Sequence, residues 1–373
     1  MAGLPPPSQS FRLASNRFQF ILKPVKATRS TGRDMQTQAS RHEPAGLHAG
    51  APRTRVQPPI TAFSLVTTEL VDCEQALFDL LSSKVQAVEE IGRYLAASGG
   101  KRLRPLFTAL GARAAGHRGA VHRLMCAGEL IHLGSLLHDD VVDEADARRG
   151  RPAAHKVFTN PSVILAGDFC VARGMLIAAE EGGLKAVTEL TRTVAEMSEG
   201  EISQLLNAGH LELGVDAYYE VIDRKSASLM AWCAAAGAWA IGQDDHGAAL
   251  HSFGRRMGVA FQIADDVLDY SGEERLTGKP AGQDLAQRKP TLPLLLAMER
   301  RPSLKDRLME RAPAESEVPA LVAEVVASGA AQDALDIARA HVRDGLADLA
   351  RLPESPARAA LVGLAHHLVE RVS

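Results

Sequence analysis

Residues 131–152 read IHLGSLLHDDVVDEADARRGRP, and this stretch decides how the rest of the chain is interpreted. Its first half is apolar with helical spacing and runs directly into Asp139, Asp140 and Asp143. In a helix, Asp139 and Asp143 lie one turn apart on the same face. Two carboxylates held this close repel each other unless a cation lies between them or one takes up a proton.

A divalent cation with oxygen ligands would relieve this repulsion. Mg²⁺ binds proteins through one or two carboxylates, together with substrate phosphates and some of its own water. The arginines that follow the acidic cluster can bind phosphate oxygens through both N–H groups of their planar fork; they are Arg148, Arg149 and Arg151. Carboxylates for a metal followed by arginines for phosphate predict a diphosphate site.

A single DDxxD segment is more often a solvated helix end than a metal site. A second copy in residues 261–270, FQIADDVLDY, reverses that balance. Its carboxylates, Asp265, Asp266 and Asp269, have the same spacing and follow an apolar run, where an uncompensated charge is costly. We therefore expect two acidic helix ends that face each other across one cluster of cations.

Composition limits the fold and the partners. The chain has 373 residues, of which 46% are hydrophobic and 4% aromatic, so we expect a core of aliphatic side chains on helices. A net charge of -3 lacks the basic excess that nucleic-acid binding requires. No apolar run has the length expected of a membrane span. The four cysteines form no CxxC pair, which argues against a zinc site or disulfide framework and favours a reducing compartment, the cytoplasm.

Residues 1–58 differ in composition from residues 59–373, which we expect to form the folded domain. They are rich in Pro, Ser, Arg and Gln, with Asp34 and Glu43 as their acids, a composition typical of an unstructured segment. One interpretation is a transit segment for the mitochondrial matrix. The other is a dispensable tail or a start codon assigned too far upstream, which the prolines at 5–7 favour because they would interrupt an early amphipathic helix.

From residue 60 onward, helical periodicity dominates and no strong strand pattern occurs. The spacing predicts a helix over 66–97 that ends at the glycines of 98–100. The basic run KRLRP at 101–105 then begins a new helix, where it either holds an anion with free backbone N–H groups or forms a solvated turn. Further helices are predicted over 119–138, 162–181, 184–207, 216–241, 246–270, 291–298 and 355–371.

Three residues within these helices are unusual. Gly134 costs about 1 kcal/mol relative to alanine in a helix interior, which indicates either close helix packing or a cavity beside the helix. His132 is either a core histidine or a ligand. Lys225, followed by Ser226 in an alanine-rich run, either reaches solvent or points into a polar pocket.

The segment 271–290, which contains several glycines and lysines, either closes over phosphates or is an ordinary connection between helices.

Five motifs, in this order and spacing, resemble those of the trans-isoprenyl diphosphate synthases: GGKRLRP, LLHDDVVDEADARRGRP, the pair Lys225-Ser226, FQIADDVLD and GKPAGQDLAQRKPTLPL. The similarity runs from about Leu65 to the end and is greatest to the octaprenyl-type synthases of quinone biosynthesis. It implies an all-α fold of the isoprenoid-synthase type, with long helices around a central cavity, and a homodimer. It also implies Mg²⁺ as cofactor, with isopentenyl diphosphate and an allylic diphosphate such as farnesyl diphosphate as substrates.

Site residues follow from the resemblance by position. It implies metal binding by Asp139, Asp143 and Asp265, supported by Asp140, Asp266 and Asp269. It implies binding of isopentenyl diphosphate by Lys101, Arg104, His132 and Arg149. It implies binding of the allylic diphosphate by Arg148, Lys225, Ser226, Gln262, Lys279 and Lys289. The catalytic residues would be Asp139, Asp143, Asp265 and Lys225. The departures from the family pattern are Ser226 for threonine, Gln283 for an acid and Arg288 for glycine.

Chain length is expected to be set beneath the first acidic motif. Ser135 and Gly134 lie four and five residues before Asp139, where shorter-chain relatives carry bulk, so the resemblance implies a long product, an octaprenyl diphosphate, with transient membrane contact for its release. The alternatives are a geranylgeranyl synthase, a non-catalytic partner subunit and a terpene cyclase. Two intact acidic motifs argue against the partner subunit, and a second diphosphate pocket argues against the cyclase.

Overall fold

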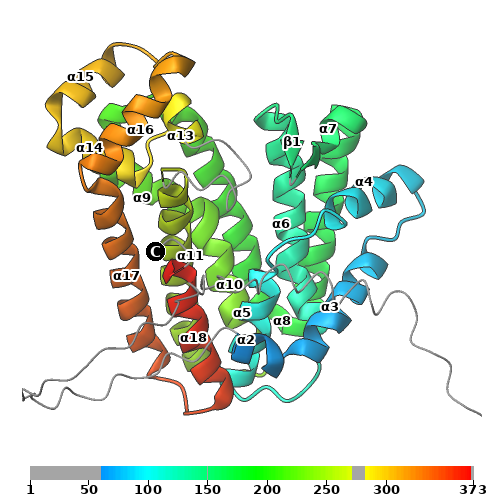
Figure 1. Cartoon of the computed structure of the whole chain (residues 1–373). Helices are drawn as coiled ribbons and strands as arrows, with labels where there is room; N and C mark the ends of the chain where they lie inside the picture. The colour runs from blue at the N-terminus through cyan, green and yellow to red at the C-terminus, as the bar shows by residue number, and fades with distance from the viewer. Residues whose placement is uncertain (1–59, 149, 271–281, 371–373) are drawn as a thin grey trace, which may run out of the picture. The chain divides into compact units, whose positions relative to one another are not determined.

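The computed structural model describes residues 60–148, 150–270 and 282–370 (Figure 1). Contacts group Pro58–Ser373 as one unit, separate from Met1–Gln57. The predicted extension 1–58, together with Arg149 and Lys279, lies outside the described residues. The following paragraphs concern the described part of the larger unit.

Helices build this unit, which confirms the all-α prediction. The first half contains α2 Ile60–Leu65, α3 Thr67–Leu80, α4 Gln86–Ala96, α5 Leu103–Ala114, α6 His122–Val142, α7 Ala154–Val157 and α8 Asn160–Asn207. The second half contains α9 Gly214–Ile222, the π-helical turn η3 Asp223–Ala227, α10 Ser228–Trp239, α11 Asp244–Leu268, α13 Gln283–Ala286, α14 Leu292–Arg300, α15 Pro302–Glu310, α16 Val318–Ala327, α17 Ala330–Leu349 and α18 Pro356–Glu370. Short 3₁₀ turns occur at η2 Leu211–Leu213 and η4 Glu315–Glu317, and β1 Ala147–Arg148 pairs antiparallel with β2 Arg151–Pro152.

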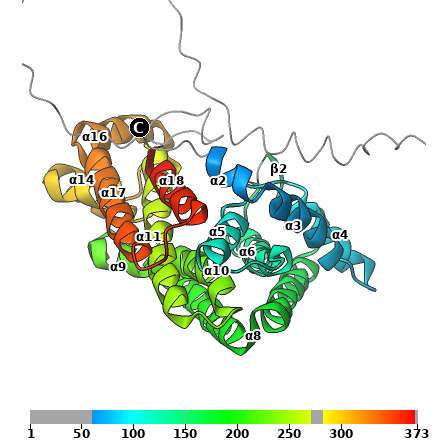
Figure 2. The ribbon, with the colours of Figure 1, turned by 90° about the horizontal axis from the view of Figure 1, so that it is seen from below.

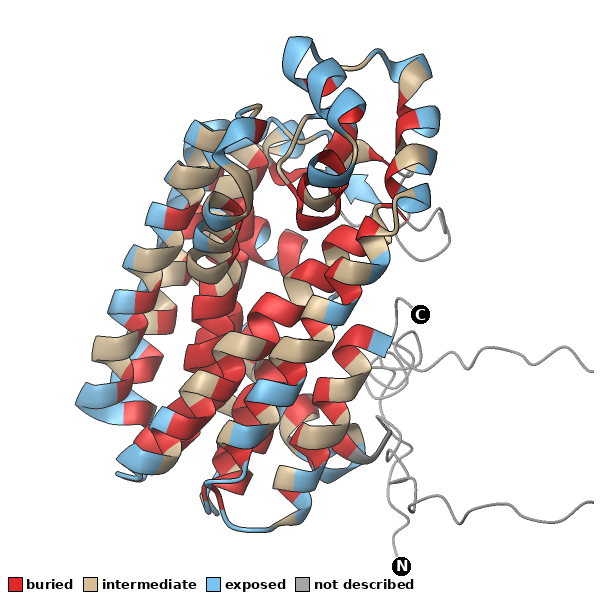
Figure 3. Cartoon of the chain, turned by 90° about the vertical axis from the view of Figure 1, so that its left-hand side faces the viewer, coloured by how far each residue is buried: buried red, intermediate tan, exposed pale blue. Residues whose placement is uncertain are grey.

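Helix α10 is the centre of the core, because each of its residues is buried. It packs against α5, α8 and α11 (Figures 1 and 2). Six of its twelve residues are alanine or glycine, and these small residues let the backbones of neighbouring helices approach closely. Figure 3 shows buried residues along the inward faces of the helices and exposed residues on their outer faces. The alanine-rich core expected from the low aromatic content is therefore present.

The predicted helix over 66–97 is wrong in one respect, because it is two helices, α3 and α4. Serines interrupt it, since their hydroxyl groups compete for backbone hydrogen bonds. Glu89 of α4 accepts hydrogen bonds from the Ser82 hydroxyl and the Ser83 backbone N–H, each at 3.1 Å. This carboxylate stabilises the first turn of α4. By contrast, the break expected between 181 and 184 lies within α8 at Gly183, whose φ of 72° is in the left-handed region.

Gly134 is a packing position. A Cβ built there would lie 2.9 Å from the Gly167 carbonyl oxygen and 2.9 Å from Val171 Cγ2, both on α8. Close contact between α6 and α8 therefore explains this glycine, and its role in setting chain length stays a prediction. Ser135 is half-buried, and its hydroxyl donates to the His132 carbonyl at 3.0 Å.

We predict that Gly134→Ala lowers the free energy of unfolding by about 1–3 kcal/mol, the usual cost of overpacking against an unyielding backbone. Ser135→Ala, at the next position of the same helix, should change it by less than about 1 kcal/mol because it adds no atoms and removes only the hydrogen bond of a half-buried hydroxyl to the His132 carbonyl. Chemical denaturation of both variants measures the difference. Equal stability of the two variants would contradict close packing as the reason for the glycine.

Candidate active site

The first acidic motif forms the C-terminal end of α6. Asp139 is half-buried, whereas Asp143 caps the helix and donates its backbone N–H to the Asp139 carbonyl at 2.8 Å. Burial raises the pKa of Asp139 to about 6, and the charges of Glu201 and Asp143 add to this rise while Lys225 and Arg148 oppose it. Charged side chains from three other parts of the chain, those that carry Glu201, Lys225 and Arg148, therefore act on this carboxylate of α6.

Asp140 has a different role from Asp139, because it is fully buried. Its carboxylate accepts a charge-assisted hydrogen bond from Arg148 Nε of β1, and the backbone N–H of Ala154 lies 3.5 Å from its second oxygen. These contacts tie the β1–β2 hairpin and α7 to the end of α6. Asp140 thereby holds the Arg148 guanidinium beside the acidic motif, which agrees with the supporting role that the sequence predicts for it.

The Lys225 side chain turns toward α8 and is largely shielded from solvent. Its Nζ forms an ion pair with Glu201 of α8, and its side chain is 24% exposed. Close approach of η3 to α8 depends on Gly200, because a Cβ there would lie 2.7 Å from the Lys225 backbone nitrogen. Lys225 lies in a π-helical turn, a wider turn that recurs at functional sites.

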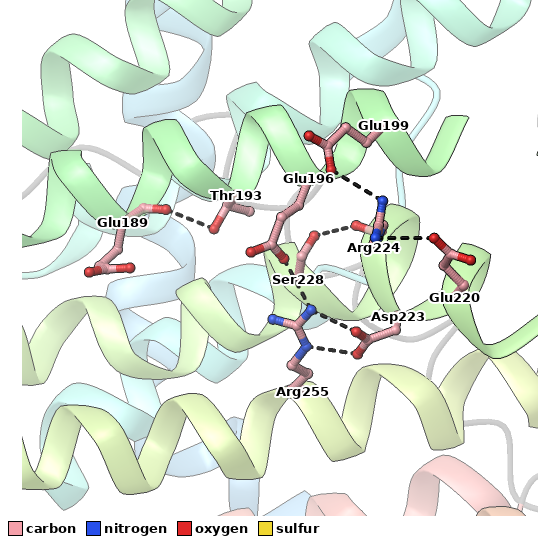
Figure 4. Close-up of polar contacts among 9 residues, drawn as sticks. All are labelled: Glu189, Thr193, Glu196, Glu199, Glu220, Asp223, Arg224, Ser228 and Arg255. Atoms are coloured by element: carbon pink, nitrogen blue, oxygen red, sulfur yellow. Dashed lines mark hydrogen bonds and ion pairs between the residues drawn. The ribbon is translucent and has the colours of Figure 1, made fainter. Parts of the chain in front are cut away.

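Ion pairs fix η3 between α8 and α11 (Figure 4). Arg255 of α11 binds Asp223 of η3 at 2.6 Å and Glu196 of α8 at 3.1 Å. Arg224 of η3 binds Glu199 of α8 at 3.2 Å. These partly exposed pairs form a network rather than isolated contacts, so they restrict the orientation of the turn that carries Lys225 and Ser226.

Hydrogen bonds connect η3 to the second acidic motif on α11. The Ser226 hydroxyl donates to Gln262 Oε1 at 3.1 Å, and the Gln262 amide donates to Asp266 at 2.9 Å. The Tyr218 hydroxyl of α9 donates to the other Asp266 oxygen at 2.7 Å. Burial raises the pKa of Asp266 to about 7. The hydroxyl that serine shares with the threonine of the family pattern is thus engaged, and Asp265, next to this buried residue, is half-buried.

The last acidic residue of the motif organises the segment that follows. Asp269 accepts backbone hydrogen bonds from Gln283 at 3.3 Å and Asp284 at 3.0 Å. Lys289 Nζ lies 3.4 Å from Asp284; burial lowers the pKa of Lys289, but Asp284 and Asp266 raise it by more, so the lysine stays charged. Arg288 adopts a φ of 52°, the left-handed conformation that glycine takes freely, so the turn of the family pattern is kept despite the substitution.

The basic run before α5 faces α11 from the other side. Lys101 Nζ lies 5.5 Å from the centroid of the Phe261 ring, which precedes the second acidic motif. Arg104 is half-buried on α5, and burial lowers its pKa while the charge of Glu129 opposes this. Within the described chain, Arg104 Nε has no hydrogen-bond partner. His132 is half-buried on α6, two turns before Asp139.

The structure therefore links most of the predicted residues. Lys225 of η3 interacts electrostatically with Asp139, and Ser226 of the same turn reaches Asp266 through Gln262. The turn η3 thus interacts with residues of both acidic motifs. Arg149 and Lys279 are not described, so their predicted contacts with diphosphate stay predictions.

Comparison with known proteins agrees with this geometry. Residues 85–328 match the family model described as polyprenyl synthetase. The chain belongs to the polyprenyl synthetase family. It is 36% identical to the octaprenyl diphosphate synthase of Escherichia coli K12 over 315 residues, covering 82% of this chain and 97% of that protein. It is 33% identical to the all-trans-nonaprenyl-diphosphate synthase of Rhodobacter capsulatus, covering 82% and 96%.

A solved structure supports the same assignment. The polyprenyl synthase of Caulobacter crescentus CB15, complexed with calcium and isoprenyl diphosphate, superposes with a TM-score of 0.80 at 36% identity, covering 86% of this chain and all of that chain. The expected family and the isoprenoid-synthase type of fold are confirmed. The polyprenyl synthetase described here is a prenyltransferase whose relatives make long chains.

Two residues of this polyprenyl synthetase escaped the sequence analysis. Glu201 pairs with Lys225 and adds to the charge beside Asp139, and its other oxygen is buried without a hydrogen-bond partner among the described residues. The mid-helix pair Gly200-Glu201 was the available signal, because a small residue next to an acid permits close approach at a charged position. Tyr218 offered no signal, since its partner Asp266 lies 48 residues away.

The donor set fits a hard divalent cation. Among the residues described, no group of three or more His, Cys, Asp or Glu side chains is close enough to hold a metal ion. Mg²⁺ uses only one or two carboxylates together with phosphate oxygens, so Asp139 and Asp143 suffice as protein ligands. Burial raises the pKa of Asp139, and the neighbouring charges of Glu201 and Asp143 add to the rise, so its carboxylate carries a charge that a bound cation would offset.

We predict that Mg²⁺ affinity falls about tenfold for each pH unit below pH 6, because Asp139 must lose its proton to bind the metal. Above that pH the affinity should level off, since the carboxylate is already ionised. Calorimetry in buffers of different ionisation enthalpy measures both the affinity and the released proton. Glu201→Gln should move the midpoint to lower pH, because it removes a charge that raises the pKa of Asp139. A flat affinity between pH 5 and 7 would disprove the metal role of Asp139.

Proposed function

We propose that this polyprenyl synthetase condenses farnesyl diphosphate with successive isopentenyl diphosphates to give all-trans octaprenyl diphosphate, the side-chain precursor of a quinone. The observation that carries the proposal is the meeting of both acidic motifs at η3, where Lys225 interacts with Asp139 and Ser226 connects to Asp266. Similarity to octaprenyl and nonaprenyl diphosphate synthases supports a long product. The cytoplasm, as the site of this reaction, is part of the same proposal.

Separation of charge is the task of the first step. The allylic C–O bond breaks to leave diphosphate and a delocalised carbocation, and a bound Mg²⁺ supplies Lewis-acid stabilisation of the leaving group. Arg148 and Lys225 are oriented before the reaction by Asp140 and Glu201, so they stabilise the diphosphate without reorganising. Lys289, kept charged by Asp284, contributes from the α11 side.

Positioning of the second substrate is the task of the basic run. Lys101 and Arg104 hold isopentenyl diphosphate so that its alkene lies next to the cation, and this proximity supplies most of the acceleration of C–C bond formation. His132 lies on α6 between this pocket and the first acidic motif. A proton is then lost to the released diphosphate, and the product serves as the next allylic substrate. Small, half-buried Ser135 leaves room for the lengthening chain and stays the proposed chain-length residue.

We predict that purified protein with Mg²⁺, farnesyl diphosphate and labelled isopentenyl diphosphate makes mainly octaprenyl diphosphate, as measured by chromatography of the dephosphorylated products. Asp139→Ala should lower turnover at least about 100-fold, because it removes a ligand of the ion that stabilises the leaving group. Asp146→Ala is the matched control, since that nearby carboxylate is 94% exposed and pairs only with Lys156 in the described chain.

Three outcomes would contradict this assignment. Near-normal turnover by Asp139→Ala would remove the metal role of the first motif. Products that stop at four isoprene units would favour the geranylgeranyl alternative. Activity that appears only after a second, different protein is added would favour the heteromeric alternative.

We propose a homodimer formed through α8. Exposed apolar side chains follow this helix, with Leu165 63%, Leu184 82% and Leu206 71% exposed. Among the described residues α8 is long and apolar enough to cross a membrane by length and composition, but this is weak evidence, because core helices of soluble proteins meet the same criteria and 39% of its most apolar window is buried. An exposed apolar face of this kind is typical of an interface between subunits.

We predict that Leu184→Asp combined with Leu206→Asp converts a dimer to a monomer, because two charges would be buried without partners. Multi-angle light scattering or sedimentation measures the mass. Val326→Asp serves as control, since Val326 is an apolar residue of α16 that is 48% exposed and lies away from α8. A wild-type monomer, or dissociation by the control variant, would argue against an α8 interface.

A further inference from the structure

Arg102 stands between the two basic residues assigned to isopentenyl diphosphate but does not share their surroundings. Lys101 is exposed and Arg104 half-buried, whereas Arg102 is only 6% exposed. Its backbone has a φ of 49° and a ψ of 33°, the left-handed conformation, which costs roughly 1–2 kcal/mol for a residue other than glycine. An arginine at such a position indicates that its side chain is needed.

The Arg102 guanidinium joins three helices at the start of α5. Nε and Nη2 bind the two oxygens of Glu74 on α3 as a fork, with Nη2 3.2 Å from Oε2. Nη1 binds Glu129 on α6, and Nη2 also lies 3.5 Å from the Ala96 carbonyl at the end of α4. Bidentate pairs of this kind fix orientation as well as charge. The left-handed turn that carries Lys101 is therefore anchored on three sides.

Glu129 connects this anchor to Arg104. Its side chain is 4% exposed, so its charge requires a partner. Arg102 supplies that partner directly, while the charge of Glu129 also reaches Arg104 and opposes the lowering of its pKa by burial. Without Arg102, Glu129 could pair instead with Arg104, which already lies within reach of its charge, and an ion pair between them would turn the Arg104 guanidinium away from phosphate oxygens.

We propose that Arg102 is a positioning residue for isopentenyl diphosphate: by binding Glu74 and Glu129 it holds the turn that presents Lys101 and keeps Arg104 available for phosphate. This inference rests on the proposed function, which assigns Lys101 and Arg104 to that substrate. Arg102 does not touch the substrate itself, so it acts on binding through its two neighbours and leaves the ionisation of the allylic diphosphate unaffected.

A matched pair of carboxylates on α3 makes the test specific. Glu74 and Glu69 are 19% and 18% exposed, and each binds an arginine of the α5 region, Glu74 through Arg102 and Glu69 through Arg113 at 2.6 Å. Their removal therefore takes away similar ion pairs between the same two parts of the fold. Only the first lies next to the residues assigned to diphosphate.

We predict that Glu74→Gln raises KM for isopentenyl diphosphate about tenfold, because small misplacements of binding groups cost large factors in affinity. The kcat and the KM for farnesyl diphosphate should stay within about twofold of wild type. Glu69→Gln should lower the melting temperature by about as much as Glu74→Gln does. Unlike Glu74→Gln, it should change neither the KM for isopentenyl diphosphate nor the KM for farnesyl diphosphate. Arg102→Gly keeps the left-handed turn but removes the guanidinium, so it should also raise the KM for isopentenyl diphosphate. Arg102→Lys keeps a positive charge and should give a KM between those of wild type and Arg102→Gly.

Several results would overturn the inference. If Glu74→Gln and Glu69→Gln lower stability equally and neither changes KM, Arg102 is only a structural anchor. If Glu74→Gln raises the KM values for isopentenyl diphosphate and farnesyl diphosphate together, Arg102 is not a positioning residue for isopentenyl diphosphate alone. Lys101→Ala separates this from failure of the proposed function: an unchanged KM for isopentenyl diphosphate in that variant would show that the assigned pocket is wrong. An increase in Lys101→Ala but not in Glu74→Gln would refute the positioning role alone.

Discussion

The burial of the Asp139 carboxylate, close to two further acids, is the constraint on which the site depends. Asp139 is half-buried with Asp143 one turn away and Glu201 nearby, so its charged form is disfavoured. Lys225 and Arg148 offset part of this repulsion, and a divalent cation with its diphosphate would offset the rest. A site built in this way is prepared for positive charge before substrates arrive. The same arrangement would favour departure of a diphosphate bound together with a metal ion, as the proposed function requires.

Close approach of helices makes this arrangement accessible to a chain with few aromatic residues. Gly200 lets η3 approach α8, and Gly134 lets α6 approach α8. The buried, alanine-rich α10 then places η3 between α8 and α11. Large side chains at these contacts would hold the elements apart, and Lys225 would no longer reach the carboxylate of α6. The positions of the charged groups at the site therefore depend on close packing of the helices in the core.

Orientation of cationic side chains by buried or half-buried acids recurs throughout the site. Asp140 holds Arg148, Glu201 holds Lys225, Asp284 holds Lys289, and Glu74 with Glu129 holds Arg102. Each pair contributes little to stability by itself, because desolvation offsets most of the attraction. Their common effect is to restrict the positions of the cationic groups that we propose bind phosphate oxygens. Such preorganisation suits a polyprenyl synthetase, whose chemistry requires stabilisation of a departing diphosphate.

The sequence by itself determined the all-α class, the two acidic motifs, the order of the five motifs and the break at Gly183, because these follow from local periodicity and residue type. Only the tertiary structure decided that Gly134 packs against α8, that Lys225 pairs with Glu201, and that Arg102 is buried against Glu74 and Glu129 while Lys101 is exposed. Within the sequence these three basic residues form one run. Their partners lie on other helices, and the direction of a side chain across a helix contact depends on the packing of the whole fold, which no local pattern encodes.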